Sequence, residues 1–368
     1  MARTLVHRPV RVVFLLPSFE VGGAERVVVR TVGGLDRLRY EAVVVAFARG
    51  SGRIAAEAER SGLRTSDLGF RSRWSPAPLV RLLRLLRDLR PEILVTMMFH
   101  AGLAGRIIGR LAGVPIIISS ERVVGWENRT RVFLNRATSS LVDAVTTNSS
   151  AGVQFWSRAL RRAEGVFLIP NGVDTGTFSP GPPQSRPTVM IGNLSRMDRD
   201  RSSGQADFLR ALSLLRQMET TSWRCVLGGD GPDRRALEAF RDDLALTDLV
   251  SFVGHVDDPA GFLRGLDLYV QPSIVEGMPN AVLEAMATGL PVAATAVGGT
   301  PEAVVQERTG LLVPPSNPAV LAAALLRLVS EPEARHRFGA AGRARVVEMF
   351  SVERMVAETE ALFEHLLG

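Results

Sequence analysis

The sequence contains a single cysteine and no lysine. With Cys225 alone, no disulfide can form within the chain, which favours a reducing compartment. All 44 basic residues are arginine, so any positive charge at a binding site has to come from arginine. Cysteine, histidine and acidic residues show no metal-ligand spacing, and we expect neither a metal nor another cofactor.

Long apolar segments are also missing. No run approaches the roughly 18 residues that a membrane-spanning helix needs. The N-terminus superficially resembles a signal peptide, but its apolar core, residues 12–16, is shorter than the roughly 7–15 residues of such a segment. These residues predict a first buried strand instead, and we expect a cytoplasmic protein.

The charge is unevenly distributed between the two halves of the chain. Residues 1–180 contain 26 Arg and 14 Asp or Glu, a balance of +12, and the remainder contains 18 and 24, a balance of −6, which together give the net +6. A basic half beside an acidic half indicates that the first half faces an anionic partner. A membrane surface, a phosphate-bearing acceptor and nucleic acid are the candidates.

Short β-branched runs alternate with amphipathic segments in both halves, which predicts βαβ units and parallel sheets. In the second half every expected strand except the last, 310–316, precedes a plausible helix. The segment SPGPPQSRP at 179–187 can hold neither a helix nor a central strand. We therefore expect an N-terminal domain at 1–178, a linker at 179–187, a C-terminal domain at 188–350 and a final helix at 351–368.

The segment EGMPNAVLEAMATG at 276–289 follows an expected strand and begins a helix. A helix N-terminus offers free N–H groups and a positive dipole end, which suit a phosphate. Glu276 precedes this position, and Glu284 lies roughly 7–8 Å along the helix from Pro279. Carboxylates repel phosphate but accept hydrogen bonds from sugar or ribose hydroxyls. The segment thus predicts a sugar-nucleotide site, although a lone pair of such glutamates often occurs by chance.

The same segment resembles the signature of group 1 glycosyltransferases, the retaining GT-B family often called family 4. Similar stretches occur in the expected order along nearly the whole chain: PSFEVGGAERVV at 17–28, IPNGVDTGTFSP at 169–180, GNLSRMDRDRSSGQADFLRAL at 192–212, LGGDGP at 227–232, VSFVGHVDD at 250–258 and VGGTPEAVVQERTGLLVPPSNPAVLAAAL at 297–325. The resemblance implies an α/β protein of GT-B fold, with two doubly wound Rossmann-like domains facing a cleft. The final helix would pack back on the N-terminal domain.

The resemblance also implies roles for individual residues of the C-terminal domain. Glu284 would bind the ribose and Glu276 a hydroxyl of the donor sugar. The backbone at Gly277, Met278, Pro279 and Asn280 would hold the donor sugar and phosphate, and the loop of Gly254, His255 and Val256 would lie near the base. In the first domain, Gly22 and Gly23 would let a loop approach the donor diphosphate or the acceptor, although a bare Gly-Gly is usually a turn.

The chain departs from the family at its phosphate-binding Arg and Lys. Asn193 stands at the Arg position, and the Lys position falls near residues 201–203. Arg196, Arg199 and Arg201 are the candidates for neutralising the leaving diphosphate, since Arg is a good phosphate partner. The alternative is a solvated loop, in which the neighbouring aspartates cancel part of the charge.

A second departure concerns the acid/base group near the reacting sugar. Many relatives carry a His after the strand at 115–120, where this chain has Glu121. His100, after the strand at 92–98, is a neighbouring candidate, although a lone His is more often structural. Glu276, Glu121 and His100 are therefore the candidate catalytic residues.

The expected helix at 78–90 places arginine at 81, 84, 87 and 90 opposite its apolar residues. This pattern is typical of a helix with a solvated face, and it also fits a helix at an anionic membrane. No nucleic-acid-binding module is recognisable.

Our interpretation is a glycosyltransferase that moves a sugar from a nucleotide-sugar donor to a glycan or lipid-linked acceptor at the inner face of the membrane. The alternatives are a non-catalytic sugar-nucleotide-binding partner protein and a GT-B sugar-nucleotide 2-epimerase.

Overall fold

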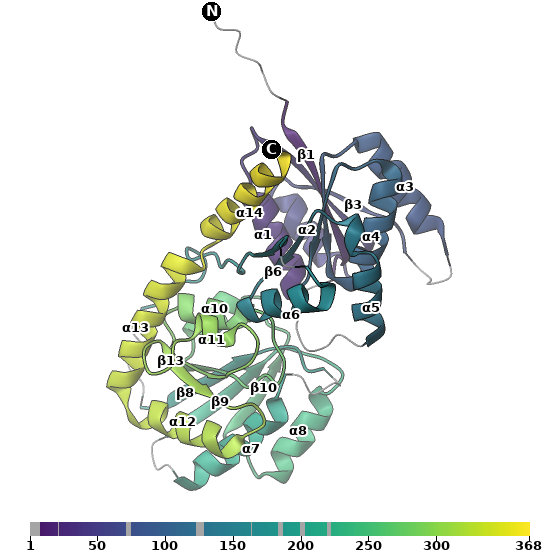
Figure 1. The fold of residues 1–368 in the computed structure, drawn as a ribbon. Helices are drawn as coiled ribbons and strands as arrows, with labels where there is room; N and C mark the ends of the chain where they lie inside the picture. The colour runs from purple at the N-terminus through teal and green to yellow at the C-terminus, as the bar shows by residue number, and fades with distance from the viewer. Residues whose placement is uncertain are drawn as a thin grey trace, which may run out of the picture. The chain divides into compact units, whose positions relative to one another are not determined.

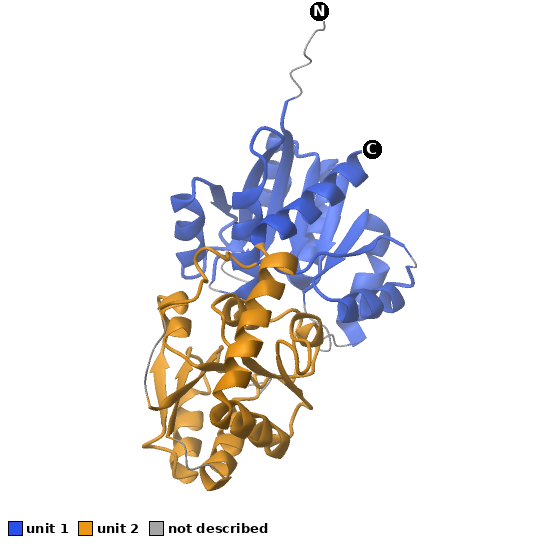
Figure 2. Ribbon diagram, turned by 90° about the vertical axis from the view of Figure 1, so that its left-hand side faces the viewer, with its two compact units in different colours: residues 1–122, 126–172, 352–368 blue, residues 123–125, 173–351 orange. Residues whose placement is uncertain are grey.

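The computed structural model describes residues 8–20, 22–70, 75–122, 129–162, 164–182, 187–198, 203–218 and 222–368. The chain forms two compact units (Figure 2). The described parts of 1–172 together with 352–368 make unit 1, and the described part of 173–351 makes unit 2.

Unit 1 is built on a seven-stranded sheet in the order β3-β2-β1-β4-β5-β6-β7, and all its strand pairs are parallel. The strands are β1 (Val10–Ser18), β2 (Tyr40–Ala48), β3 (Arg64–Asp67), β4 (Ile93–Met97), β5 (Ile116–Ser120), β6 (Ala144–Thr147) and β7 (Val166–Leu168). Alternate residues of a strand point to opposite faces. In β1, Val12 and Phe14 enter one buried cluster, while Val13 and Leu15 enter the other.

Helices cover both faces of this sheet (Figure 1). The cluster that contains Phe14 includes residues of α1 (Gly23–Gly34), α2 (Arg53–Arg60) and the C-terminal helix α14 (Val352–Leu367). The cluster on the opposite face includes residues of α3 (Ala77–Leu89), α4 (Met98–Ala112) and α6 (Ser150–Leu160). Helix α5 (Arg129–Ala137) packs against α4 and α6, and the 3-10 turn η1 (Ser139–Leu141) follows it.

Unit 2 repeats this architecture with six strands in the order β10-β9-β8-β11-β12-β13. The strands are β8 (Val189–Leu194), β9 (Trp223–Gly228), β10 (Val250–Gly254), β11 (Leu268–Gln271), β12 (Val292–Thr295) and β13 (Gly310–Val313). Residues of α7 (Gln205–Met218), α8 (Arg234–Asp243) and α12 (Pro318–Ser330) pack on one face. Residues of α9 (Pro259–Arg264), α10 (Asn280–Ala287) and α11 (Thr300–Ala303) pack on the other, and α13 (Pro332–Met349) contributes to both clusters.

The two doubly wound parallel sheets confirm the expected fold class. Some details of the sequence-based expectation were wrong. The last strand of unit 2 is followed by a helix, α12, and the short edge strands β3 and β7 were missed. Pro279 is the N-cap of α10, in an extended conformation, and the helix itself begins at Asn280.

The ends of the units lie at different positions from the expected domain limits. Residues 173–178, expected in the first domain, belong to unit 2, where the Val173 N–H donates to the Phe350 carbonyl at 2.9 Å. Helix α14 belongs to unit 1, where its Val356 packs against Gly34 of α1. Residues 183–186 of the expected linker lie outside the described residues. Among the described helices, none is both long and apolar enough to cross a membrane.

Candidate functional site

The loop between β11 and α10 in unit 2 carries Glu276. In a parallel α/β sheet, ligands bind beyond the carboxyl ends of the strands, and this loop lies at such an end. The Glu276 carboxylate is only partly exposed and accepts hydrogen bonds from Ser273 Oγ at 2.9 Å and from Gln271 Nε2 at 3.1 Å. Burial raises the pKa of Glu276, and these two donors oppose the rise because they favour the charged form.

A second layer of hydrogen bonds fixes the orientation of the Gln271 amide. The Tyr269 hydroxyl lies 2.8 Å from Gln271 Oε1 and 3.1 Å from the Leu194 carbonyl, and it donates its one hydrogen to the nearer acceptor, Gln271. The Leu194 N–H donates to the same hydroxyl at 3.3 Å. With its oxygen facing Tyr269, Gln271 must turn its NH₂ group toward Ser273 and Glu276. Tyr269 thus positions Gln271, and Gln271 positions the carboxylate of Glu276.

Glu284 lies in α10, on the same side of β11 as Glu276. Its side chain is buried, with only 5% of the residue exposed. Burial raises the pKa of Tyr269, and the negative charges of Glu284 and Glu276 raise it further. The two glutamates that the sequence singled out therefore both interact electrostatically with one tyrosine hydroxyl. Pro279 offers no side-chain cap, so the first N–H groups of α10 have no capping side chain.

A glycine turn after β12 packs directly against the backbone of Glu276 and Gly277. The Gly299 N–H donates to the Gly277 carbonyl at 2.7 Å. Gly298 has φ +53°, and a Cβ there would lie 1.9 Å from the Glu276 carbonyl oxygen. Only glycine fits this position, because both the conformation and the space exclude a side chain. Thr300 follows, and its buried hydroxyl has no hydrogen-bond partner among the described residues.

The loop expected near the nucleotide base follows β10 in the same unit. Gly254 has φ +71°, and its carbonyl accepts a hydrogen bond of 2.7 Å from Gly229, the first residue after β9. The His255 side chain is 44% exposed and lies 3.4 Å from Asp257 Oδ1. Val256 is half-buried beside it. A backbone hydrogen bond therefore joins the loops that follow β9 and β10.

Asn193, which stands where the resemblance places an arginine, is held inside unit 2 by hydrogen bonds. Asn193 is fully buried, donates to the Val270 carbonyl at 2.9 Å and accepts from Ser195 Oγ at 2.8 Å. Arg196 extends into solvent, with 71% of its side chain exposed, and pairs with Asp198 at 2.7 Å. Arg199 and Arg201 lie outside the described residues.

In unit 1, Gly22 and Gly23 lie at the N-terminus of α1, where Gly22 is the N-cap. A Cβ at Gly22 would lie 2.2 Å from Glu25 Oε2, so the Glu25 carboxylate folds back over this helix end. Burial raises the pKa of Glu25, and the nearby charge of Glu20 adds to the rise. A phosphate bound at this helix end would have to displace Glu25 or meet it in the protonated form.

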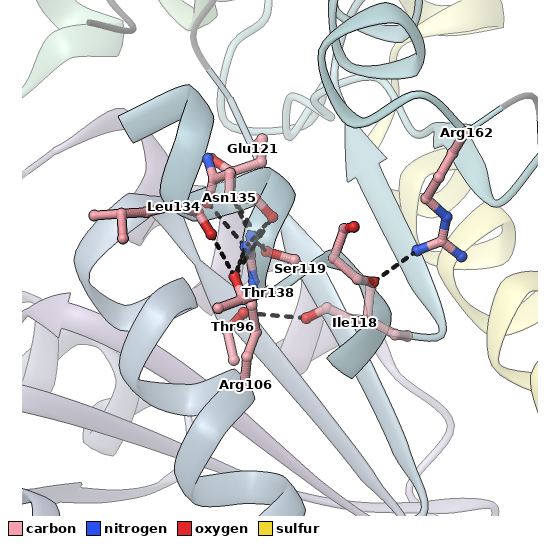
Figure 3. Close-up of polar contacts among 10 residues, drawn as sticks. Thr96, Arg106, Ile118, Ser119, Glu121, Leu134, Asn135, Thr138 and Arg162 are labelled. Carbon is pink, nitrogen blue, oxygen red and sulfur yellow. Dashed lines mark hydrogen bonds and ion pairs between the residues drawn. The ribbon is translucent and has the colours of Figure 1, made fainter. Parts of the chain in front are cut away.

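Glu121 forms a buried ion pair with Arg106 of α4 (Figure 3). Arg106 Nη2 lies 3.0 Å from Glu121 Oε1 and 2.6 Å from Ser119 Oγ, and Arg106 Nη1 donates to Asn135 Oδ1 at 2.9 Å. Burial lowers the pKa of Arg106, and the charge of Glu121 opposes this. The ion pair places Glu121 as a residue that holds the end of β5 against α4 and α5.

His100, the other candidate in unit 1, is exposed in the first turn of α4. It packs edge-to-face on Phe99 at 5.3 Å between ring centroids. Met98, which joins β4 directly to α4, has φ +64°, a strained conformation for a residue with a side chain. Such strain often occurs at functional sites, and here it lies at the carboxyl end of a central strand.

The sequence analysis missed Tyr269, Gln271 and Arg106 as residues of these networks. Tyr269 and Gln271 alternate along β11, in a strand otherwise read only as apolar. Arg106 lies beside Gly105 and Gly109 on the buried side of α4, and a charge among small and apolar residues was the available signal. No cluster of three or more potential metal ligands occurs in the part of the chain that the structure describes.

Two family models match the chain. The model described as "Glycosyltransferase Family 4" matches residues 21–177, and the model described as "Glycosyl transferases group 1" matches residues 188–331. Each falls on one of the two sheets described above.

Curated relatives and solved structures agree with these matches. The 2-deoxystreptamine glucosyltransferase of Streptomyces kanamyceticus is 26% identical, over 95% of this chain and 96% of the relative. A GDP-mannose-dependent phosphatidylinositol monomannoside mannosyltransferase of Mycobacterium tuberculosis is 29% identical, over 77% and 79%. HepE of Anabaena, solved in complex with UDP, superposes with a TM-score of 0.84 at 20% identity, over 96% of this chain and 100% of HepE.

The chain is a glycosyltransferase with the GT-B fold. It uses a nucleotide-sugar donor, which confirms the glycosyltransferase activity predicted from the sequence. These relatives do not favour the epimerase or the non-catalytic partner protein.

Proposed function

We propose that the protein is a retaining glycosyltransferase of group 1, family 4, whose donor binds in unit 2. The observation that carries this proposal is the pair of glutamates beside Tyr269, one held by Gln271 and Ser273 and the other buried in α10. In the proposed complex Glu284 accepts hydrogen bonds from the ribose, and Glu276 accepts one from a hydroxyl of the donor sugar.

The donor diphosphate is proposed to bind at the N-terminus of α10. The backbone of Gly277, Met278, Pro279 and Asn280 leads into this helix, whose N–H groups and dipole favour an anion. Arginine then supplies the remaining positive charge, in place of a metal ion. Arg196 can contribute only by leaving Asp198, whereas the loop at 254–256 is proposed to contact the base.

The proposed roles of the unit 1 residues differ from one another. His100 is exposed and is proposed as the general acid or base that transfers a proton. Glu121 is ion-paired and is proposed to position the end of β5 instead. The backbone at Gly22 and Gly23 is proposed to contact donor or acceptor once Glu25 moves aside.

The acceptor is proposed to be a glycan or a lipid-linked molecule, and the setting to be the cytoplasm at the inner face of the membrane. The basic balance of residues 1–180 supports an anionic acceptor or surface for unit 1. One relative is named for action on a phosphatidylinositol mannoside, a lipid. Another is named for galactosyl transfer to a sugar on diphosphoundecaprenol.

A nucleotide-binding screen tests the donor site. The purified protein is titrated calorimetrically with UDP, GDP, ADP and TDP and with representative sugar nucleotides. One nucleotide should bind selectively, and Glu284→Gln should weaken it about 10–100-fold, the usual cost of losing a charged hydrogen-bond acceptor. Glu333→Gln, an exposed glutamate of α13, is the control and should bind normally. Equal binding by the wild type and Glu284→Gln would refute the ribose assignment.

Retention is tested separately, by the configuration of the first product. NMR of early time points should show the donor's anomeric configuration in the transferred or hydrolysed sugar. The opposite configuration would overturn the retaining assignment and leave the donor site intact.

A further inference from the structure

Helices α3, α4 and α5 present an outer surface that is both apolar and positively charged. They lie side by side on one flank of unit 1, with α4 in contact with both others (Figure 1). Together they contain eight arginines and one acidic residue, Asp88; of these arginines, Arg106 is buried against Glu121 and Arg110 pairs with Asp143, which leaves six for the surface. Five of the thirteen exposed large apolar side chains among the described residues also lie here: Leu79, Val80, Ile107, Leu111 and Phe133.

The helical spacing aligns these side chains on the faces that point away from the sheet. In α4, Ile107 and Leu111 are four residues apart and are 42% and 62% exposed. In α3, Val80, Arg84 and Arg87 follow the same spacing, opposite the buried Leu82 and Leu86. The middle helix thus carries an apolar stripe, and a flanking helix carries arginines.

Helix α5 repeats this pattern on the other flank of α4. Phe133 is 68% exposed, and Asn135 on the inner face is fully buried. Arg129 and Arg136 are exposed on either side of Phe133. No ion pair with a described acidic residue involves Arg84, Arg87, Arg129 or Arg136. Exposed apolar side chains on three neighbouring helices, flanked by arginines on α3 and α5, have the composition of an interaction surface with a polar rim.

We infer that this outer face of α3, α4 and α5, with Ile107, Leu111 and Phe133 at its centre, binds the surface of an anionic lipid bilayer. The apolar side chains enter the boundary between headgroups and acyl chains, and the arginines contact lipid phosphates. The inference rests on the proposed function in one respect: a lipid-linked acceptor lies in the membrane, so the enzyme must reach the membrane surface to use it.

Other occupants fit the observations less well. A second copy of the chain, related by twofold symmetry, would bring arginines against arginines, and like charges repel. Nucleic acid would pair with the arginines but would leave the central aliphatic side chains without a role. An anionic membrane uses both features at once.

The test is binding of the full chain to vesicles in a flotation assay. Phosphatidylcholine vesicles with and without phosphatidylglycerol are compared at low and high salt. We expect binding only to the anionic vesicles, weakened by salt. Arg84→Ser with Arg87→Ser should weaken it about 25-fold, at roughly fivefold for each arginine. Ile107→Ser with Leu111→Ser should also reduce binding, because the inserted apolar area is lost.

Matched controls come from exposed residues of unit 2. Arg235→Ser with Arg308→Ser removes the same charge, and Val320→Ser with Val347→Ser removes exposed apolar side chains. Both controls should bind vesicles like the wild type, and all variants should unfold at similar temperatures.

Three outcomes would overturn the inference. They are no binding of the wild type to anionic vesicles, equal losses in the control variants, and self-association abolished by Ile107→Ser with Leu111→Ser in the absence of lipid. Because the assay uses neither donor nor acceptor, nucleotide binding by unit 2 is measured independently. A failure here would leave the proposed function standing.

Discussion

Replacing Gln271 with glutamate tests whether its amide positions Glu276. The substitution keeps the size and shape of the side chain but exchanges the NH₂ group for an oxygen. In the wild type, Gln271 Nε2 lies 3.1 Å from Glu276 Oε1. In Gln271→Glu two carboxylates would meet at that distance, so one of them must keep a proton.

The magnitude follows from this separation. Two unit charges 3.1 Å apart repel by about 5 kcal/mol at an effective dielectric constant of about 20, equivalent to about 4 pKa units. Side-chain movement relieves part of the repulsion, and we expect the pair to keep its shared proton to about 2 pH units above the point at which Glu276 of the wild type loses its own. The corresponding free energy is about 3 kcal/mol.

The sign of the effect on stability is fixed by the direction of the shift. Because the pKa of the pair is higher in the folded than in the unfolded protein, the folded state is favoured when the pair holds its proton and is disfavoured when the proton is lost. Relative to the wild type, Gln271→Glu should therefore be unimpaired below about pH 4, should lose stability as the pH rises through the raised pKa of the pair, and should stay destabilised above that. The loss should lower the melting temperature at pH 8 by about 6–12 °C.

Thermal unfolding across this pH range is the assay, and it needs no substrate. The matched control is the exchange of the two side chains, Gln271→Glu with Glu276→Gln, which restores one amide and one carboxylate. Its melting temperature should follow the wild-type pH dependence. A difference between Gln271→Glu and the wild type that does not change with pH would refute the proposed orientation, as would an exchange variant that behaves like Gln271→Glu.

Two further predictions concern the ion pair of unit 1 and the glycine turn of unit 2. Glu121→Gln leaves the buried Arg106 without its counter-charge and should lower the free energy of unfolding in urea by about 3–5 kcal/mol. Adding Arg106→Leu should recover part of this loss. A double variant whose loss equals the sum of the two single losses would contradict the pairing. Gly298→Ala should weaken sugar-nucleotide binding at least tenfold, because it displaces the Glu276 backbone. The control is Gly33→Ala in α1, where a Cβ meets nothing within 4 Å. It should bind normally and gain about 0.5–1 kcal/mol of stability.

Much of the fold could be predicted because its signals are local. The alternation of apolar strands with amphipathic helices is periodic over short windows, and β4 and β5, expected at 92–98 and 115–120, were predicted within a residue or so. The missed strands are at the edges of the sheet of unit 1. In β3 no residue is fully buried, and β7 has only three residues, so neither gives an apolar run. The limits of the units depend on contacts between distant residues, such as Val173 with Phe350.

The site was predictable only where its residues follow one another in the chain. Glu276, Pro279 and Glu284 belong to one segment with a readable strand, loop and helix. Gln271, the partner that positions Glu276, could not be predicted in this way. It acts through the orientation of its amide, which is set by a hydrogen bond to Tyr269 in the folded protein. The pairing of Glu121 with Arg106 joins α4 to β5 across 15 positions, and charge alone could not identify it.

The two units share a costly arrangement at the carboxyl edges of their sheets. Unit 1 buries Arg106 with Glu121, and unit 2 buries Glu284 beside the Tyr269, Gln271 and Glu276 network. Removing such groups from water costs several kcal/mol per charge, and apolar side chains of similar volume often stabilise a protein as well or better. Stability therefore does not account for these networks. Polar networks fix side chains in one geometry, as the proposed binding of a sugar nucleotide requires at Glu276. In unit 1 this holds for the bonded atoms of the network, whereas Arg106 Nε and Asn135 Nδ2 have no hydrogen-bond partner among the described residues. The network of unit 1, which joins β5 to α4 and α5, is then expected to serve geometry in the same way: Glu121→Gln should impair transfer to the acceptor more than it impairs nucleotide binding, a comparison that loss of stability alone would not produce.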